Sequence, residues 1–225
     1  MKTITSRELE SVDIELGEDM LQGNRILAER NRRKLDEAGV YAVDILGSVG
    51  SGKTTLVQQM VIHLSGKAKT AAIAGDLTTT IDADRIQQAG AEVVQINTGK
   101  ECHLDANLVH RALSELNLKA LDVVFVENVG NLICPGEFPI GAHDRIVVVS
   151  TTEGPYMIRK HPYIVMETSV VVVNKIDLAE IMGVDLGQLR KDAQDVKPGI
   201  GVVFTNARTG QGVPDLLQLL RIPKS

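Results

Sequence analysis

The sequence has few of the residues that mark secreted or membrane proteins: among 225 residues it contains two cysteines, no tryptophan and 3% aromatic residues. Cys102 and Cys134 are too few for the disulfide framework of a small secreted domain, and a reducing compartment leaves both as thiols. Apolar runs such as 146–149 and 170–173 are far shorter than the roughly 18 residues of a membrane span. Residues 1–9 lack the apolar segment of a secretory signal. We therefore expect a cytoplasmic protein with no membrane segment.

The chain also lacks an excess of basic residues. Its 24 Lys and Arg are outnumbered by 29 Asp and Glu, which gives a formal net charge of -5 and a pI near 5.6. Proteins that bind the phosphate backbone of nucleic acids usually present a strongly basic surface. We therefore expect no nucleic acid among the main partners. With 44% hydrophobic residues, the chain is long enough to bury one substantial core.

From residue 41 onward, short β-branched apolar runs alternate with segments of helical pattern. This alternation predicts an α/β fold with a mainly parallel sheet and helices on both faces. Continuous runs such as 170–173 are typical of strands that are buried on both faces. We expect strands at 41–46, 70–75, 92–96, 121–127, 145–150, 169–173 and 201–204, and helices at 53–64, 105–117, 185–195 and 213–220.

Residues 1–38 precede this pattern and form a predicted N-terminal helical extension, ahead of a domain that covers residues 39–225. The segment from Gly17 to Ala38 is charged and favours a helix, and one apolar stripe of that helix could dock onto the core. The stripe consists of Leu21, Ile26, Leu27 and Leu35.

The first chemical motif lies between the first strand and the first helix expected in the domain. Residues 47–54, GSVGSGKT, fit both the P-loop pattern and the strand–loop–helix context that it requires, which a chance glycine-rich turn would not. Backbone N–H groups of such a loop converge on phosphate oxygens at a helix N-terminus. The Lys53 amine then reaches the β- and γ-phosphates, and the Thr54 hydroxyl binds Mg²⁺. The residues expected to bind nucleotide here are Gly47, Gly50, Ser51, Gly52, Lys53, Thr54 and Thr55, and the domain is predicted to have the P-loop NTPase fold.

A second motif, residues 174–177 with the sequence NKID, follows a predicted strand and has the form by which GTPases read guanine. The Asp177 carboxylate can accept hydrogen bonds from the ring N–H and the exocyclic amine of guanine, a donor pair that adenine does not offer. Lys175 can lie along the ring face, and Asn174 completes the motif. Taken alone, the motif could be a surface turn, because these residue types are common after strands. Downstream, Thr205 and Ala207 belong to a loop that resembles the S-A-K loop of GTPases, where Ala207 would donate its N–H to the guanine carbonyl.

A third feature is an acidic residue at the end of an apolar strand. Glu127 ends residues 123–127 and is well placed to hold Mg²⁺ and to sense the γ-phosphate, with Gly130 as the switch glycine. Asp76 ends another strand near the same edge, and residues 76–84 look like a switch loop or a polar loop that leads into a capped helix. The expected catalytic residues are Lys53, Asp76 and Glu127, and the expected magnesium ligands are Thr54, Asp76 and Glu127.

Together these residues resemble one family, the HypB-type GTPases that incorporate nickel into hydrogenases. The resemblance covers most of the chain from about residue 20 onward. The urease accessory GTPases share the P-loop but typically carry a Cys-Pro-His motif that is absent here. The matching segments are 47–55, 75–77, 82–86, 98–104 (TGKECHL), 127–135 (ENVGNLICP) and 174–177.

The resemblance implies that Cys102, His103 and Cys134 bind nickel or zinc. Thiolate and imidazole ligands suit both metals, but three residues are an incomplete set, and a second subunit could supply the rest. The alternative is that both cysteines are small buried hydrophobes. Residues 1–40 contain no Cys and no His, so the nickel-storing tract of some family members is absent.

We therefore predict a slow, switch-like GTPase that uses GTP or GDP with Mg²⁺ and carries Ni²⁺ or Zn²⁺. The resemblance implies a homodimer favoured by GTP, with a HypA-like nickel chaperone and the hydrogenase large subunit as partners, and Lys160 as a contact to the neighbouring nucleotide. A metal-independent GTP-gated interaction module and a urease-type nickel accessory GTPase are the alternatives. A small-molecule kinase with a P-loop would have no need of the NKID motif.

Overall fold

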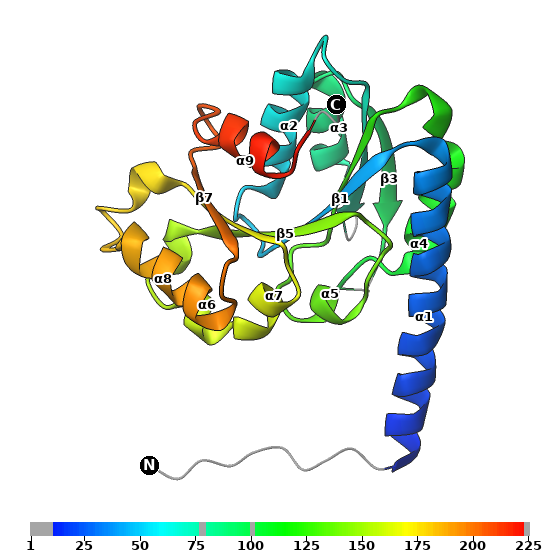
Figure 1. The fold of residues 1–225 in the computed structure, drawn as a ribbon, viewed down its shortest axis with the longest axis horizontal. Helices are drawn as coiled ribbons and strands as arrows, with labels where there is room; N and C mark the ends of the chain where they lie inside the picture. Colours follow the sequence, from blue (N-terminus) through cyan, green and yellow to red (C-terminus); the bar gives the residue numbers. More distant parts are fainter. Residues whose placement is uncertain (1–10, 77–79, 100–101, 223–225) are drawn as a thin grey trace.

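The structure is a computed structural model, and it describes residues 11–76, 80–99 and 102–222 (Figure 1). The side chains of residues 11–19, 134 and 135 lie outside this description. The described part contains no helix that is long and apolar enough to cross a membrane.

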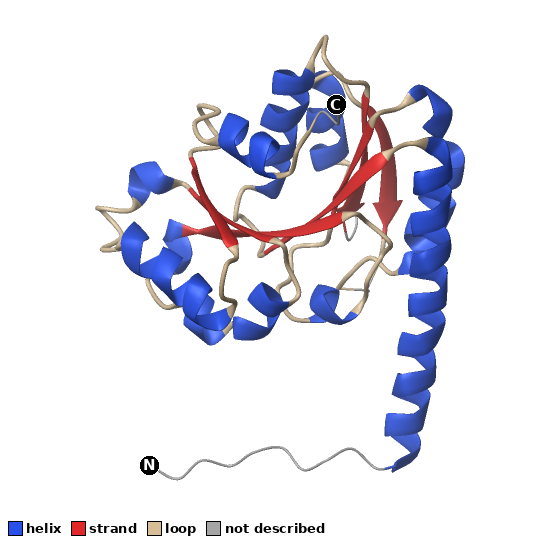
Figure 2. Cartoon of the chain, viewed as in Figure 1, coloured by secondary structure: helices blue, strands red, loops and turns tan. Residues whose placement is uncertain are grey.

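A seven-stranded sheet, in which every pair of neighbouring strands is parallel, forms the centre of the molecule (Figure 2). The strand order is β3-β2-β4-β1-β5-β6-β7. Because β1 lies between β4 and β5, the loops after these three strands meet at the carboxyl edge of the sheet, where open α/β sheets bind ligands. The strands are β1 Tyr41–Gly47, β2 Thr70–Asp76, β3 Glu92–Asn97, β4 Val123–Glu127, β5 Asp144–Ser150, β6 Val170–Asn174 and β7 Gly201–Thr205.

Helices cover both faces of the sheet (Figures 1 and 2). On one face, α2, α3 and α9 pack on the alternate strand residues represented by Val43, and on the other face α1, α4, α6, α7 and α8 pack on those represented by Ala42. The helices are α1 Ser11–Ala38, α2 Lys53–Leu64, α3 Ile81–Gln88, α4 Ala106–Glu115, α5 Cys134–Glu137, α6 Met157–Lys160, α7 Pro162–Met166, α8 Leu186–Val196 and α9 Val213–Leu219, with single 3-10 turns at Leu118–Ala120, Thr151–Glu153 and Ile176–Leu178.

The predicted α/β fold is confirmed, and the predicted strands and long helices agree with the structure to within a few residues. The starts of α4 and α8 are marked in the sequence by N-cap residues, Asp105 and Asp185. Their carboxylates accept backbone N–H groups of the two helices. The short helices α5, α6 and α7 were not predicted, since four or five residues are too few to show a helical period.

Helix α1 is present as predicted; of the predicted stripe, Leu35 is buried, Leu21 and Leu27 are partly buried, and Ile26 is exposed. Ile26 is 50% exposed, whereas Asn24, Ala28, Asn31 and Leu35 are buried. Their spacing follows one face of the helix, and two of the four are amides that reach backbone carbonyls of the domain: Nδ2 of Asn24 donates to Pro139 O at 2.8 Å, and Nδ2 of Asn31 donates to Ala106 O at 2.8 Å and to Ile140 O at 3.0 Å. The predicted apolar stripe was therefore wrong at Ile26, because hydrogen bonds hold much of this interface.

Candidate functional site

The loop between β1 and α2 has the conformation that its glycines allow. Gly50 and Gly52 have φ of 76° and 100°, in the left-handed region that residues with a Cβ rarely adopt. At Gly52, a Cβ would also collide with the side-chain amide of Asn174. The loop thus turns tightly into the N-terminus of α2, where backbone N–H groups can hold an anion.

The Lys53 side chain folds back into this loop. It is 7% exposed, and its amine donates to the carbonyls of Gly47 and Ser48 at 3.1 Å each. Burial lowers the pKa of Lys53, while the nearby carboxylate of Glu127 and those of other acidic residues oppose this shift. A nucleotide phosphate at the loop would supply a stronger acceptor for the same amine.

Thr54 and Glu127 meet on the other side of the loop. The Thr54 hydroxyl donates to Glu127 Oε1 at 2.7 Å, and the Glu127 carboxylate is buried. Burial raises the pKa of Glu127 to about 7, against the opposing effects of Thr54 and Lys53. Its second oxygen, Oε2, is buried and accepts no hydrogen bond from any described residue. The Thr54 hydroxyl oxygen and this unpaired carboxylate oxygen are both oxygen ligands, which Mg²⁺ prefers.

A cleft of about 340 Å³ at the carboxyl edge of the sheet connects these groups. It brings together every predicted catalytic and magnesium-binding residue, Lys53, Thr54, Asp76 and Glu127, with Lys175 of the base-reading motif. The remaining lining residues are Val49, Gly50, Gly52, Thr55, Gly75, Asp82, Arg85, Asn128 and Gly130. Of these, Asp82 and Arg85 come from α3, whose chemical role the sequence did not reveal.

Asn174 joins the phosphate loop to the predicted base-binding loop. Its Nδ2 donates to Ser51 O at 2.9 Å, and its Oδ1 accepts from the Thr205 hydroxyl and the Ala207 N–H, both at 3.0 Å. The Ala207 N–H that we expect to contact guanine is therefore bonded to Asn174 here, and the guanine contact stays a prediction. Asn174 fixes the spacing between the two loops.

The other two residues of the motif lie at the surface beside the cleft. Lys175 has a left-handed backbone with φ of 60°, and its amine donates to the Thr152 hydroxyl at 3.3 Å. Asp177 is the middle residue of the 3-10 turn Ile176–Leu178 and is exposed. An exposed carboxylate at this position is able to accept the two donors of a guanine ring.

The predicted metal-binding segment contacts residues 127–131 through Cys102 and Leu104. Although Cys102 and His103 are adjacent in the chain, their side chains converge: the Cys102 sulfur lies 3.8 Å from His103 Nδ1. The His103 ring stacks on Phe138, with centroids 4.0 Å apart. Cys134 is the first residue of α5, and its side chain lies outside the described residues. Within the described part of the chain, no group of three or more His, Cys, Asp or Glu side chains is arranged to hold a metal.

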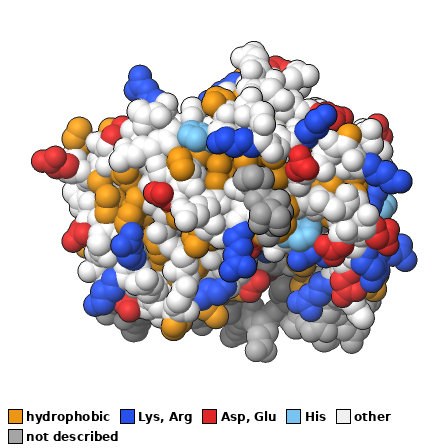
Figure 3. All heavy atoms as spheres, turned by 45° about the horizontal axis from the view of Figure 1, so that its top comes forward, with side chains coloured by type: hydrophobic (Ala, Val, Ile, Leu, Met, Phe, Trp, Pro, Cys, Tyr) orange, Lys and Arg blue, Asp and Glu red, His pale blue; other side chains and the backbone are white. Residues whose placement is uncertain are grey.

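The face of the molecule drawn in Figure 3 carries charged side chains of both signs. On the face in Figure 3, basic and acidic side chains are interspersed around patches of hydrophobic ones.

The chain is similar to proteins of one known family. Residues 41–204 match the family model described as the CobW/HypB/UreG nucleotide-binding domain. The chain is 46% identical to the probable hydrogenase maturation factor HypB of Methanocaldococcus jannaschii, over 92% of this chain and 94% of that protein. It is 36% identical to the hydrogenase maturation factor HypB of Escherichia coli, over 92% of this chain and 71% of that protein.

Two solved structures have the same fold with substantial sequence identity. The hydrogenase maturation factor HypB of Archaeoglobus fulgidus superimposes with a TM-score of 0.82 at 38% identity, over 89% of this chain and 98% of that one. HypB of Helicobacter pylori, solved in complex with nickel, superimposes with a TM-score of 0.83 at 31% identity, over 88% and 93% of the two chains.

Proposed function

The chain belongs to the HypB family of hydrogenase maturation factors, and from this membership we propose that it is a GTPase that carries nickel for insertion into a [NiFe] hydrogenase. The observation that carries the proposal is the position of the Glu127–Asn131 segment. Its first residue bonds to Thr54 of the phosphate loop, and its last residue, through Asn131 Nδ2, donates to Cys102 O at 3.4 Å. One short segment thus contacts both the nucleotide site and the metal-binding segment.

The nucleotide is GTP. The base-reading residues Asn174, Lys175 and Asp177 follow β6 directly, and Asn174 holds the loop of Thr205 and Ala207 next to the phosphate loop. A small-molecule kinase would require an ATP site, and the carboxylate of Asp177 has no donor pair to accept on adenine.

Hydrolysis relies on charge placement. Lys53 neutralises charge on the β- and γ-phosphates, while Thr54, Asp76 and Glu127 would hold Mg²⁺, directly or through water. When bound, the ion offsets the negative charge that develops between these phosphates. Arg85 lines the cleft, but its guanidinium is bonded to Thr55 and Gln58. Hydrolysis is therefore slow and serves as a switch, until a partner or a second subunit completes the site.

Nickel is the cargo, and zinc is its closest competitor for the same ligands. The side chains of Cys102 and His103 already converge, and Cys134 follows the nucleotide switch by a few residues. A thiolate pair with an imidazole suits either metal but leaves its coordination incomplete. A second copy of the chain supplies the missing ligands, so GTP-favoured dimerisation gates metal binding, and hydrolysis releases nickel toward a HypA-like chaperone or the hydrogenase large subunit.

Calorimetric titration of nickel into the reduced protein tests this proposal, with GDP and with a non-hydrolysable GTP analogue. We expect specific binding that depends on the nucleotide and is weakened by Cys134→Ala, while that substitution leaves nucleotide binding intact. Unchanged nickel affinity in Cys134→Ala would refute the metal site. Absence of specific binding in both states would favour the metal-independent interaction module.

A further inference from the structure

A connected group of three polar side chains, two of them buried and one partly exposed, adjoins the nucleotide cleft. They are Asp44 in the middle of β1, Asn128 directly after β4, and Arg145 on β5. Asp44 is fully buried, and its two carboxylate oxygens accept from Asn128 Nδ2 at 3.3 Å and from Arg145 Nε at 2.9 Å. Asn128 alone lines the cleft, and neither Asp44 nor Arg145 takes part in nucleotide binding.

At one end of this group, Asn128 binds two segments with a single oxygen. Its Oδ1 accepts from the backbone N–H of Val129, in the nucleotide switch, at 3.0 Å. The same oxygen accepts from the N–H of Leu104, directly after His103, at 2.9 Å. Asn128 is also the neighbour of Glu127 in the chain, so a shift of Glu127 necessarily moves the anchor of the Cys102–His103 segment.

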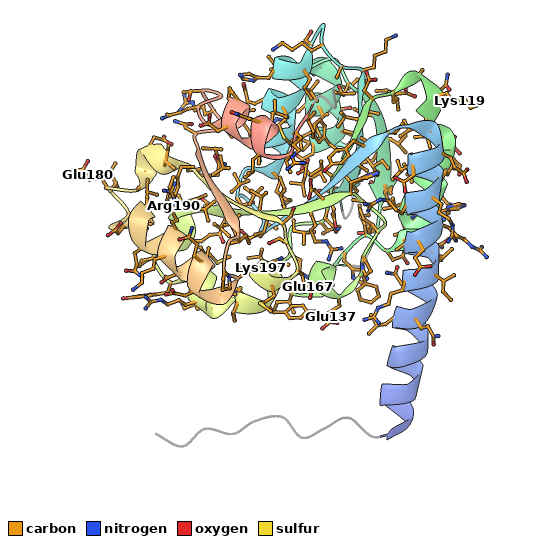
Figure 4. All side chains as sticks on the ribbon, viewed as in Figure 1. Lys119, Glu137, Glu167, Glu180, Arg190 and Lys197 are labelled. Atoms are coloured by element: carbon orange, nitrogen blue, oxygen red, sulfur yellow. The ribbon has the colours of Figure 1, made fainter. Side chains whose placement is uncertain are left out.

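At the other end, Arg145 holds the backbone that follows Cys134. Its Nη1 donates to Gly136 O at 3.1 Å, and its Nη2 donates to Phe138 O at 3.0 Å. Glu137, labelled in Figure 4, lies between these two anchored residues in α5. Because the Phe138 ring stacks on His103, the segment held by Arg145 contacts the segment held by Asn128.

Burying the Asp44 carboxylate costs free energy, so stability alone does not explain this group. Burial raises the pKa of the Asp44 carboxyl, and Arg145 and Asn128 only oppose that effect. Buried ion pairs often contribute no more stability than well-packed apolar side chains of similar volume. The neighbouring strand positions Val43 and Ile45 are apolar and completely buried, so a carboxylate here interrupts an otherwise apolar strand.

We infer that Asp44, Asn128 and Arg145 are positioning residues that transmit the state of the nucleotide to both metal-binding segments. This inference rests on the proposed function. If Thr54 and Glu127 both held Mg²⁺, the hydrogen bond between them would be replaced, and a resulting shift of residues 127–129 would move Leu104 through Asn128. Asp44 and Arg145 pass the same shift to Gly136 and Phe138. The group sets the distance between Cys102–His103 and Cys134 in each nucleotide state.

The test measures the coupling between the nucleotide site and the nickel site, not the rate of GTP hydrolysis. Nickel is titrated calorimetrically into the reduced full chain at saturating GDP, and again at a saturating non-hydrolysable GTP analogue with Mg²⁺. The ratio of the two nickel dissociation constants is the readout, and couplings between sites are typically about 5- to 150-fold. We expect Asn128→Ala to bring this ratio to within about twofold of one. Saturating nucleotide compensates for any weaker binding at the cleft.

A second variant guards against misfolding of the first. Asp44→Asn keeps the shape of the side chain and an acceptor for Asn128, and Arg145 retains its two carbonyl acceptors. It removes the charge and, with the amide oxygen toward Asn128, places an NH2 group where Arg145 Nε had its acceptor. We expect a ratio between those of the unaltered chain and Asn128→Ala.

Asn31→Ala is the matched control. Asn31 is also a completely buried asparagine, and it bonds to Ala106 and Ile140 close to the same two segments, without touching the switch. We expect this variant to keep the full ratio. A full ratio in Asn128→Ala and Asp44→Asn, or an equal loss in Asn31→Ala, would overturn the inference. If the unaltered chain itself shows no dependence on nucleotide, the proposed function fails, and the inference fails with it.

Discussion

At the scale of single residues, much of the site consists of side chains that hold other groups in place. Asn174 uses its whole amide to tie Ser51 to Thr205 and Ala207. The motif therefore assigns different tasks to its members, because Asn174 is 2% exposed while Asp177 is exposed. We therefore expect Asp177 to be the residue that reads the base.

Asp177→Asn should change the base that the protein prefers. An amide at this position cannot accept both the ring N–H and the amine of guanine, whereas it can donate to the second carbonyl of xanthine. Loss of hydrogen bonds to a charged group costs about 3 kcal/mol for two bonds, or roughly a 100-fold weaker affinity for GTP. Fluorescence titration with GTP and XTP measures this. Equal losses for both nucleotides would contradict the assigned role, and Asp185→Asn, at the α8 N-cap, is the control.

Glu127→Gln should remove the negative charge at the proposed magnesium site while it keeps the shape of the side chain. The amide oxygen can still accept from the Thr54 hydroxyl, so we expect only a small change in the free energy of unfolding. Because the amide lacks the charge that attracts Mg²⁺, we expect magnesium-dependent GTP hydrolysis to fall about 100-fold, the usual loss for one preorganised electrostatic group. Phosphate release at several Mg²⁺ concentrations is the measurement. Thr54→Ser retains a hydroxyl and should keep most of the activity; wild-type rates in Glu127→Gln would remove Glu127 from the site.

At the scale of elements, the sequence was sufficient to predict a helix or strand where an apolar pattern repeats or where a capping residue marks the end of a helix. The buried strands are continuous apolar runs, and the P-loop is defined by glycines whose backbone angles other residues rarely adopt. Leu35 on the docking face of α1 was predicted, but the buried Asn24 and Asn31 escaped prediction because their acceptors are carbonyls more than 70 residues away in the chain. Asp44 could have been noticed, as a charge inside a buried strand, but its partners Asn128 and Arg145 are set by strand order alone.

Paired substitutions in α1 test that account of its docking. Asn31→Ala leaves the carbonyls of Ala106 and Ile140 without this donor, and unsatisfied buried groups cost about 1–3 kcal/mol each. Ile26→Ala removes a half-exposed side chain, and we expect a change within about 0.5 kcal/mol. Urea denaturation followed by circular dichroism measures both. A larger loss for Ile26→Ala would restore the apolar stripe predicted from the sequence.

At the scale of the whole molecule, one short segment, residues 127–131, contacts both the phosphate loop and the Cys102–His103 segment. The nucleotide cleft contains Lys53, Thr54, Asp76 and Glu127, while one chain supplies Cys102, His103 and Cys134 to the metal site that we propose. If a second copy supplies the missing ligands, as we propose, metal affinity is linked to assembly.

Two substitutions should therefore separate the contribution of nickel to dimer formation from that of the nucleotide. Cys102→Ala should abolish the dimer formed on addition of nickel but retain the nucleotide effect, because Cys102 does not line the cleft. Lys53→Ala should lose nucleotide binding and its effect on mass, yet still bind nickel weakly. Light scattering of the reduced proteins with nickel, with GTP analogue and with both gives the mass in each state. If Cys102→Ala dimerises with nickel as the unaltered chain does, the shared site lies elsewhere. If Lys53→Ala responds fully to the nucleotide, the phosphate loop does not drive assembly.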